Sequence, residues 1–399
     1  MDERLFHLIE HARTNVAFYR RWLEGLPHVQ TVDELSKLPL LHRRDVQAAG
    51  TDLVVDGVNP SKLRKVHTGG TTGVALELYR DPDDAMHEQA RIRAARMRFG
   101  VPDEAKIVAV VGRPVGEDGR ALFVPRSRTL WLGSGTASLS HDLFVEHYSS
   151  LCEFRPHLVR GYPTMLAMLS QSMLDEGLPP PASIIAVESS SEVLHRWQAD
   201  LIHDAFGVPH HNLYGQVEHV AMASSCPHSP ELHVDQTYGV VELTDDDGQV
   251  IRHPNVVGEV VATGLGNWTT PLIRYRTGDR ASWADDECPC ANQGPRLAGI
   301  EGRIREVLID RHGQRHVFGN RFYGRLWVDG SPLRQAQFRH PGAGQLRLEA
   351  VLRDDVDRAA AARWLCEALS HLDEFDVTVT LVGEVQRTAV GKQPLLLME

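Results

Sequence analysis

The sequence is poor in several features that define particular classes of protein. It has only five cysteines in 399 residues. This odd number argues against a disulfide framework and favours a reducing, cytoplasmic setting. No apolar run approaches the ~20 residues that a membrane span needs, so we expect no membrane partner. Residues 1–4 open acidic with no apolar core after them, and we therefore expect no signal peptide.

The chain also lacks an excess of positive charge, internal repeats and low-complexity segments. Its net charge of −11 at pH 7 argues against non-specific binding to nucleic acid. What is present is ordinary for a globular protein, with 42% apolar and 24% charged residues. The length leaves room for two or three domains.

One stretch, residues 66–73, concentrates glycine and threonine. Glycine lets a backbone turn with its N–H groups pointing inward, and threonine adds hydroxyl donors, a combination suited to holding phosphate. The loop is not a Walker A motif, because Val74 follows its last glycine where that motif has lysine. On turn composition alone, a simple hairpin turn is equally consistent. The candidate phosphate-binding residues are Thr68, Gly69, Gly70, Thr71, Thr72 and Gly73.

Strands and helices alternate between residues 151 and 218. Strands are expected at 157–162 and 183–187, and a third strand ends at residues 212–214. Helices are expected at 163–176 and from Ser191, as cap, to Gly207. This alternation predicts parallel β-α-β units with right-handed crossovers. Ligands then bind beyond the carboxyl ends of the strands. The polar stretches 188–191 and 214–218 lie at those ends, and we expect them to be neighbours in space.

The pattern changes after residue 232. Short strands alternate with Asp/Gly turns over 232–302, which predicts an antiparallel subdomain. A small α+β unit follows, with strands at 346–352 and 375–382 around a helix at 356–370. The predicted fold class is α/β, with a large N-terminal domain over 1–302 that has a parallel β-α-β core and an antiparallel β subdomain. A small, mobile α+β C-terminal domain covers 303–399.

Five motifs occur in a recognisable order along the chain. They are the Gly/Thr loop, Tyr214-Gly215-Gln216-Val217-Glu218, Tyr275-Arg276-Thr277-Gly278-Asp279, Gly302-Arg303 and Gly391-Lys392. In this order they resemble the adenylate-forming superfamily, and within it most closely the phenylacetate–CoA ligase family. The resemblance covers nearly the whole chain and implies the adenylate-forming enzyme fold.

The resemblance also implies a role for each motif. The Gly/Thr loop would hold the β- and γ-phosphates of ATP, and Glu218 would bind Mg²⁺. Tyr214 would stack on adenine in a pocket lined by Gly215, Glu188 and Ser189. Asp279 would accept hydrogen bonds from the ribose, with Arg303 beside it.

Lys392 would reach both the substrate carboxylate and the α-phosphate, and the resemblance makes Lys392, Glu218 and Thr68 the catalytic residues. Two anions must meet in this reaction, so a lysine and Mg²⁺ would offset their repulsion. Plainer readings exist, because Glu218 suits a solvated loop, Asp279 a turn and Lys392 an ordinary surface position.

A second group of residues favours a metal. Cys226, His228 and His233 precede the pair Cys288 and Cys290, and thiolates with imidazole at such spacings suit tetrahedral zinc. Many members of the resembled family show a similar pattern. We expect a structural zinc site of Cys226, His233, Cys288 and Cys290, with His228 as the rival histidine. The alternative is a set of scattered free cysteines.

The chain departs from the family at three places. Arg305 stands where the family has an acidic hinge residue, residues 310–320 match its Arg-Gly loop poorly, and no Lys-Pro follows Gly73. These differences leave adenylation credible and put transfer to CoA in question. The acyl acceptor therefore stays open between CoA and an amine, a carrier protein or a partner enzyme.

The predicted function is ATP- and Mg²⁺-dependent activation of a carboxylic acid to acyl-AMP with release of pyrophosphate. The resemblance favours an aryl or arylacetic acid, with a pocket drawn from Tyr162, Val187, Tyr214, Gly215 and the loop 123–131. It is also compatible with a homodimer. The alternative of another class is a zinc-stabilised nucleotide-binding protein without catalysis.

Overall fold

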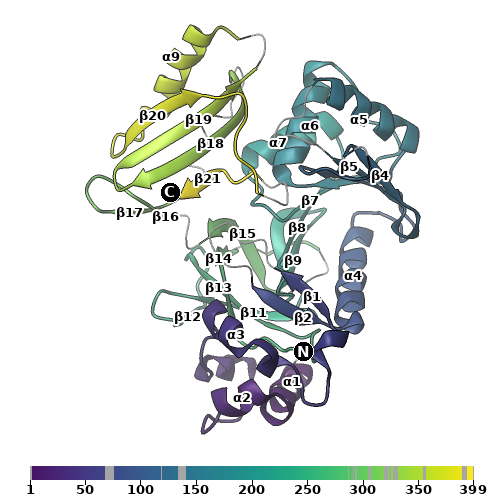
Figure 1. Cartoon of the computed structure of the whole chain (residues 1–399), viewed down its shortest axis with the longest axis vertical. Coiled ribbons are helices and arrows are strands. Elements are labelled where there is room, and N and C mark those ends of the chain that lie inside the picture. The colour runs from purple at the N-terminus through teal and green to yellow at the C-terminus, as the bar shows by residue number, and fades with distance from the viewer. Residues whose placement is uncertain are drawn as a thin grey trace. The chain divides into compact units, whose positions relative to one another are not determined.

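The chain forms two compact units, each assembled from two separate stretches (Figure 1). The computed structural model describes residues 2–67, 76–117, 119–133, 141–285, 287–290, 292, 294–303, 307–318, 322, 325–326, 331–353, 356–388 and 393–398. The first unit combines residues 1–103 and 211–301, and the second combines 104–210 and 302–399. The domain boundary predicted between 302 and 303 stays a prediction.

The first unit begins with short helices packed on a hydrophobic core. Tyr19 anchors them, because its buried hydroxyl donates to the Pro271 carbonyl at 3.0 Å and accepts from the Ile273 amide at 3.0 Å. These contacts join segments more than 250 residues apart in sequence. The elements are α1 (Asp2–Asn15), α2 (Ala17–Trp22), α3 (Arg43–Ala49), the hairpin β1 (Arg64–His67) and β2 (Glu77–Arg80), and α4 (Pro82–Met97).

Helix α4 begins at residues that are typical of a helix start. The Asp81 side chain caps the helix by accepting the Asp84 amide at 2.8 Å, and Pro82 occupies the first turn. Asp84 and Glu88 are four residues apart in this helix and therefore lie on the same face of it.

The sheet of the first unit is antiparallel in every pairing that is assigned a register. Its strand order is β12-β11-β13-β14-β15-β10-β9-β8. The strands are β8 (His210–Gly215), β9 (Met222–Cys226), β10 (Ser229–Val234), β11 (Gly239–Thr244), β12 (Val250–Ile251), β13 (Gly258–Gly264), β14 (Tyr275–Trp283) and β15 (Arg296–Arg303). The predicted antiparallel subdomain is confirmed.

The second unit contains the predicted parallel core. Strands β3 (Ile107–Val111), β5 (Thr129–Gly133), β6 (Leu158–Gly161) and β7 (Ala186–Ser190) run parallel in the order β5-β3-β6-β7. Strand β4 (Ala121–Val124) adds an antiparallel edge. Helices α5 (His141–Phe154), α6 (Pro163–Asp175) and α7 (Arg196–Phe206) share a hydrophobic core with one face of this sheet.

Two predicted boundaries in this core are wrong. The strand expected at 183–187 is β7, which begins three residues later, at Ala186. Ser191 does not cap the next helix. Its backbone is left-handed with φ of 71°, and α7 begins at Arg196 after a capping box formed by His195 and Gln198. Residues 191–195 therefore form a loop that carries Glu192.

The C-terminal stretch builds its own small sheet. Strands β18 (Leu333–Gly342) and β19 (Gln345–Leu352) form an antiparallel hairpin, with β20 (Asp376–Leu381) and β21 (Leu396–Met398) parallel to its two edges. Helix α9 (Arg358–Leu369) lies over this sheet (Figure 1) and buries Leu365 and Leu369. A hairpin of β16 (Val307–Ile309) and β17 (Arg315–Val317) precedes it. The predicted α+β unit, and with it the predicted fold class, is confirmed.

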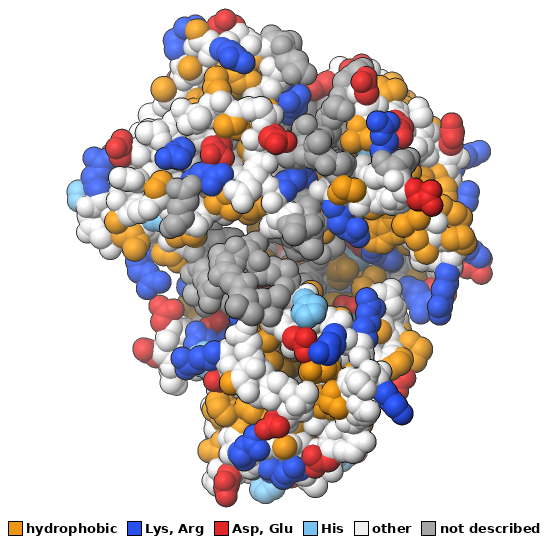
Figure 2. All heavy atoms as spheres, viewed as in Figure 1, with side chains coloured by type: hydrophobic (Ala, Val, Ile, Leu, Met, Phe, Trp, Pro, Cys, Tyr) orange, Lys and Arg blue, Asp and Glu red, His pale blue; other side chains and the backbone are white. Residues whose placement is uncertain are grey.

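Charged side chains of both signs are interspersed with hydrophobic ones on the face drawn in Figure 2. Among the described residues, no helix combines the length and the apolar character that crossing a membrane requires.

Candidate functional site

The turn after β8 carries predicted site residues. Tyr214 and Gly215 end the strand, and Glu218 follows three residues later. The His219 amide donates to the Gln216 carbonyl at 3.1 Å and closes the turn. Gln216 Nε2 donates to the Tyr214 hydroxyl at 2.7 Å, so the turn is tied back onto the strand that leads into it.

Tyr214 is joined to Asp279, a residue of β14 that lies 65 positions along the chain. Its hydroxyl donates to Asp279 Oδ2 at 2.9 Å. Burial, and then the charge of Asp279, raise the pKa of Tyr214 well above its usual range, so the phenol remains a donor at neutral pH. Because an ionised carboxylate accepts several hydrogen bonds, Asp279 can hold Tyr214 and still accept ribose hydroxyls.

Glu218 is held from the same strand. The Tyr275 hydroxyl donates to Glu218 Oε1 at 3.1 Å, and Tyr275 is itself buried. Burial, and then the negative charge of Glu218, raise the pKa of Tyr275. The Glu218 side chain is half-buried. A carboxylate at such a position offers the hard oxygen ligand that Mg²⁺ prefers, so this residue fits the predicted metal.

A group of charged residues beside this turn was not predicted from the sequence. We call Arg80, Asp84, Glu88 and His219 the carboxylate cluster. His219 Nδ1 lies 3.0 Å from Asp84 Oδ2, and its Nε2 lies 2.6 Å from Glu88 Oε2. Arg80 also pairs with Asp84. Burial opposes the charge on His219, but the hydrogen bonds to Asp84 and Glu88 outweigh it and raise its pKa. The signal available in the sequence was the pair of acids four residues apart on a helix.

The remaining predicted pocket residues lie in the second unit. Tyr162 precedes the first residue of α6, and burial, followed by the charge of Glu192, raises its pKa. Val187 is fully buried in the core shared with the helices. Glu188 is 1% exposed, and Ser189 Oγ lies 2.9 Å from His210 Nε2. Since 188–191 and 214–218 fall in different units, their predicted proximity stays a prediction.

A row of side chains crosses the sheet of the second unit at Glu188. In the parallel register, Ala109 is opposite both Trp131 and Arg160, and Arg160 is opposite Glu188. Residues in such register point to the same face of a sheet. Ala109 is small, so the Arg160 guanidinium reaches over the Trp131 ring, 5.2 Å from its centroid. Trp131, the last residue of the predicted pocket loop 123–131, thus makes a cation–π contact with Arg160.

Glu192, in the loop before α7, joins separate stretches of the second unit. Its Oε2 accepts from the Thr164 hydroxyl at 2.8 Å and from the Thr164 amide at 3.2 Å, at the start of α6. Its Oε1 accepts from the Gln393 amide at 3.2 Å. A single carboxylate therefore links α6 to the residue that follows Lys392 in the sequence.

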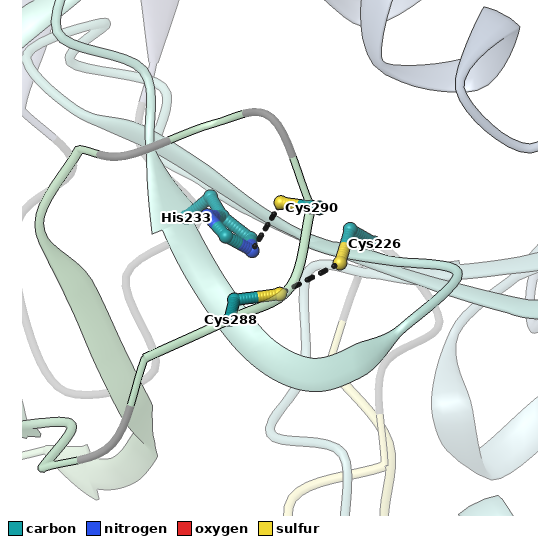
Figure 3. Close-up of side chains that lie close together, drawn as sticks. All are labelled: Cys226, His233, Cys288 and Cys290. Atoms are coloured by element: carbon teal, nitrogen blue, oxygen red, sulfur yellow. Dashed lines mark hydrogen bonds between the residues drawn. The ribbon is translucent and has the colours of Figure 1, made fainter.

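The predicted zinc ligands lie together (Figure 3). We call Cys226, His233, Cys288 and Cys290 the thiol cluster. Their ligand atoms all lie within 4.8 Å of one another. The Sγ atoms of Cys226 and Cys288 are 3.5 Å apart, and Cys290 Sγ is 3.5 Å from His233 Nε2. A tetrahedron with Zn–S bonds of ~2.3 Å has edges of about 3.8 Å, so the spacing of the four side chains is compatible with such a centre.

The rival histidine is outside this cluster. His228 lies in the turn between β9 and β10 and is exposed, whereas His233 is 1% exposed on β10. Burial raises the pKa of the Cys226 thiol to about 11. Burial also acts on Cys288, but hydrogen bonds from the Cys290 amide and the Cys226 thiol prevail and lower its pKa. The other two cysteines, Cys152 and Cys366, are exposed.

Several predicted residues cannot be placed. Thr68, Gly69, Gly70, Thr71, Thr72, Gly73 and Lys392 lie outside the described residues. Arg303 is the last residue of β15, and only its backbone is described. Their predicted roles stay predictions.

The comparisons with known proteins agree with the motif order. No family model matches the chain. Protein CapK of Staphylococcus aureus is 25% identical over 286 residues, which cover 70% of this chain and 61% of CapK. The phenylacetate-coenzyme A ligase of Thermus thermophilus is 22% identical over 323 residues, covering 78% of this chain and 71% of that enzyme. The chain thus spans about three-fifths of CapK and seven-tenths of the ligase.

Solved structures share the fold over the whole chain. A 2-hydroxyisobutyryl-CoA ligase, in the postadenylation state with an acyl-AMP, superposes with a TM-score of 0.75 at 19% identity, covering 100% of this chain and 88% of that one. The fold is therefore that of the acyl-CoA ligases of the adenylate-forming superfamily. The resemblance predicted from the motifs is confirmed, and the relatives of this chain are phenylacetate–CoA ligases and CapK.

Proposed function

We propose that this protein is an AMP-forming ligase that activates a carboxylic acid, with an aryl or arylacetic acid as the substrate class. The carboxylate oxygen attacks the α-phosphorus of ATP, the bond from that phosphorus to the bridging oxygen breaks, and pyrophosphate leaves with the electron pair. The acyl-AMP then reacts with the CoA thiolate at its carbonyl carbon, forming the thioester and releasing AMP.

One observation carries the proposal. The structure brings Tyr214 and Glu218, at the end of β8, against Asp279 and Tyr275 of β14, with hydrogen bonds of 2.9 and 3.1 Å. Of these, the motif order assigns Tyr214 to adenine, Glu218 to Mg²⁺ and Asp279 to ribose. A carboxylate for a metal thus lies on the same turn as the expected nucleoside contacts, as binding of a magnesium nucleotide requires.

The remaining steps belong to residues whose roles are inferred from the motifs. The Gly/Thr loop would hold the leaving pyrophosphate, and Lys392 would offset the charge of the two reacting anions. When bound, Mg²⁺ would supply charge neutralisation at the phosphates. A movement of the C-terminal domain after Arg303 would then admit the acceptor.

The test is acid-dependent exchange of labelled pyrophosphate into ATP across a panel of aryl and arylacetic acids. Exchange should require both the acid and Mg²⁺, and Glu218→Gln should abolish most of it in a folded protein. Addition of CoA should then convert the adenylate to a thioester. ATP binding without exchange under any acid would refute the proposal and leave a non-catalytic nucleotide-binding protein. Acyl-AMP that never reacts with CoA would instead point to another acceptor.

For the thiol cluster we propose a structural zinc ion. Four protein ligands leave no open position for a substrate, which is the arrangement of structural rather than catalytic zinc. Purified protein should contain about one zinc per chain, measured by atomic emission, and Cys226→Ser should remove it. Zinc-free protein from a preparation grown with added zinc would count against the site.

A further inference from the structure

His219 follows the candidate magnesium ligand directly, and its backbone is unusual. Its φ is 55°, in the left-handed region that few side chains adopt. Neighbouring side chains then diverge. Glu218 meets Tyr275 of β14, while His219 meets Asp84 and Glu88 of α4. Side chains of two different elements, β14 and α4, therefore contact this turn.

The backbone of the same turn packs against a pair of glycines. Gly239 of β11 and Gly264 of β13 are directly paired in the sheet. A Cβ on Gly264 would lie 2.6 Å from the His219 carbonyl oxygen, and one on Gly239 would overlap the Val220 carbonyl oxygen. Only glycine at both positions lets the chain approach the sheet this closely. The glycine pair thus lets the carbonyl oxygens of residues 219 and 220 pack against the sheet, and it places no constraint on the side chains of the turn.

The His219 ring is held by polar contacts at both of its nitrogens as well as by packing. Its two nitrogens lie 3.0 and 2.6 Å from carboxylate oxygens, and its side chain is 10% exposed. Asp84 is oriented in turn by Arg80. With both ring nitrogens bonded, the imidazole cannot rotate without breaking a charge-assisted hydrogen bond. Since Glu218 is one residue away, a fixed His219 limits the rotation of the backbone that carries Glu218.

We propose that His219 is a positioning residue for Glu218, acting through Asp84 and Glu88 to hold the carboxylate where it binds the magnesium of MgATP. This inference rests on the proposed function. It predicts a defect confined to metal-dependent nucleotide binding, because the contacts of Tyr214 and Asp279 do not pass through α4. A purely structural His219 would change stability and leave the metal dependence alone.

The experiment measures the affinity for ATP by calorimetry, once with Mg²⁺ and once with a chelator. The variants are His219→Asn, which tolerates the left-handed backbone, and His87→Asn, a matched control on α4 whose ring stacks on Tyr238. His219→Asn should weaken MgATP binding about tenfold and metal-free ATP binding less than twofold, whereas His87→Asn should change neither. Equal MgATP affinities for the two variants would overturn the proposal.

A second pair keeps the test decisive if His219→Asn fails to fold. Glu88→Ala removes one partner of the ring, and Glu88→Gln retains an oxygen that accepts from Nε2. Glu88→Ala should weaken MgATP binding several-fold, and Glu88→Gln should restore most of the loss. No change in folded Glu88→Ala would refute the role of His219. If Glu218→Gln itself leaves the effect of Mg²⁺ on affinity unaltered, the fault lies in the proposed function and not in the positioning.

Discussion

The thiol cluster and the carboxylate cluster both place a single histidine among acidic side chains in the first unit. They differ in the partners of those acidic side chains. In the carboxylate cluster, Arg80 and His219 face Asp84 and Glu88, so the protein supplies its own cations. In the thiol cluster, three sulfurs and one imidazole lie within 4.8 Å of one another, with contacts of 3.5 Å in the pairs Cys226–Cys288 and Cys290–His233. The comparison shows that close ligand atoms alone do not define a metal site, and that the chemistry of the partners decides.

The largest expected effect is loss of the thiol cluster. Structural zinc contributes ~10 kcal/mol or more in small zinc domains, and within a larger fold Cys226→Ser should cost on the order of 5 kcal/mol. The measurement is denaturant unfolding together with zinc content. Cys366→Ser, at an exposed cysteine of α9, is the matched control and should change neither. Equal stability of the two variants would mean that the cluster holds no stabilising metal.

Asp84→Asn should have the next largest effect. Removing one partner from a buried ion pair costs ~3–5 kcal/mol, because the charge left behind has lost its compensation. Asp83→Asn is the control, an exposed neighbour in the first turn of the same helix, where a helix-dipole contribution of only ~0.5 kcal/mol is at stake. Chelators should leave the Asp84→Asn loss unchanged, and a loss that depended on metal would erase the distinction between the clusters.

Acid provides a third test of the carboxylate cluster. Burial works to raise the pKa of Asp84, but His219 and Arg80 outweigh it and the pKa is lowered from 3.8. A carboxyl whose pKa is lowered by folding stabilises the folded state at any pH above the pKa that it has in the unfolded chain. This contribution disappears as the pH falls through the pKa that the carboxyl has in the folded protein. The stability difference between the natural protein and Asp84→Asn should therefore shrink between about pH 4 and pH 2. A constant difference in unfolding free energy over that range would contradict this account.

The smallest expected effect comes from Tyr214→Phe, which removes one neutral donor from a carboxylate. Losing such a hydrogen bond costs about 1.5 kcal/mol. Tyr148→Phe, whose hydroxyl donates to the Pro179 carbonyl at an exposed position, should cost less than about 0.5 kcal/mol. Thermal unfolding of both variants measures the difference. A Tyr214→Phe loss as large as that of Asp84→Asn would mean that the charge of the carboxylate cluster matters less than we argue.

The two clusters also differ in how far the sequence predicts them. Cysteine is scarce in this chain, so the spacing of Cys226, Cys288 and Cys290 already indicated one site. The choice between His228 and His233 needed the structure, because it depends on which histidine the β9–β10 hairpin buries. Asp84 and His219, 135 residues apart, are common residue types with no such signature.

The prediction that Ser191 caps helix α7 is wrong, although the residues around it suit a cap. Ser191 followed by a polar stretch is typical of a helix cap, yet the helix begins five residues later, at Arg196. The loop between them presents Glu192 to Thr164 and Gln393, contacts that involve residues distant in sequence. The parallel core and the C-terminal sheet were predictable, because apolar periodicity and strand length specify them locally.

The paired glycines of β11 and β13 have a consequence for the order in which the molecule is assembled. The backbone of His219 and Val220 packs directly against the β11–β13 ladder, so its position depends on that ladder. We therefore expect the turn that carries Glu218 to be ordered only in molecules in which this ladder, with its contacts of long sequence separation, is formed. Affinity for a magnesium nucleotide would then be acquired only by chains that have completed this sheet, which makes the ligand a selective stabiliser of finished molecules.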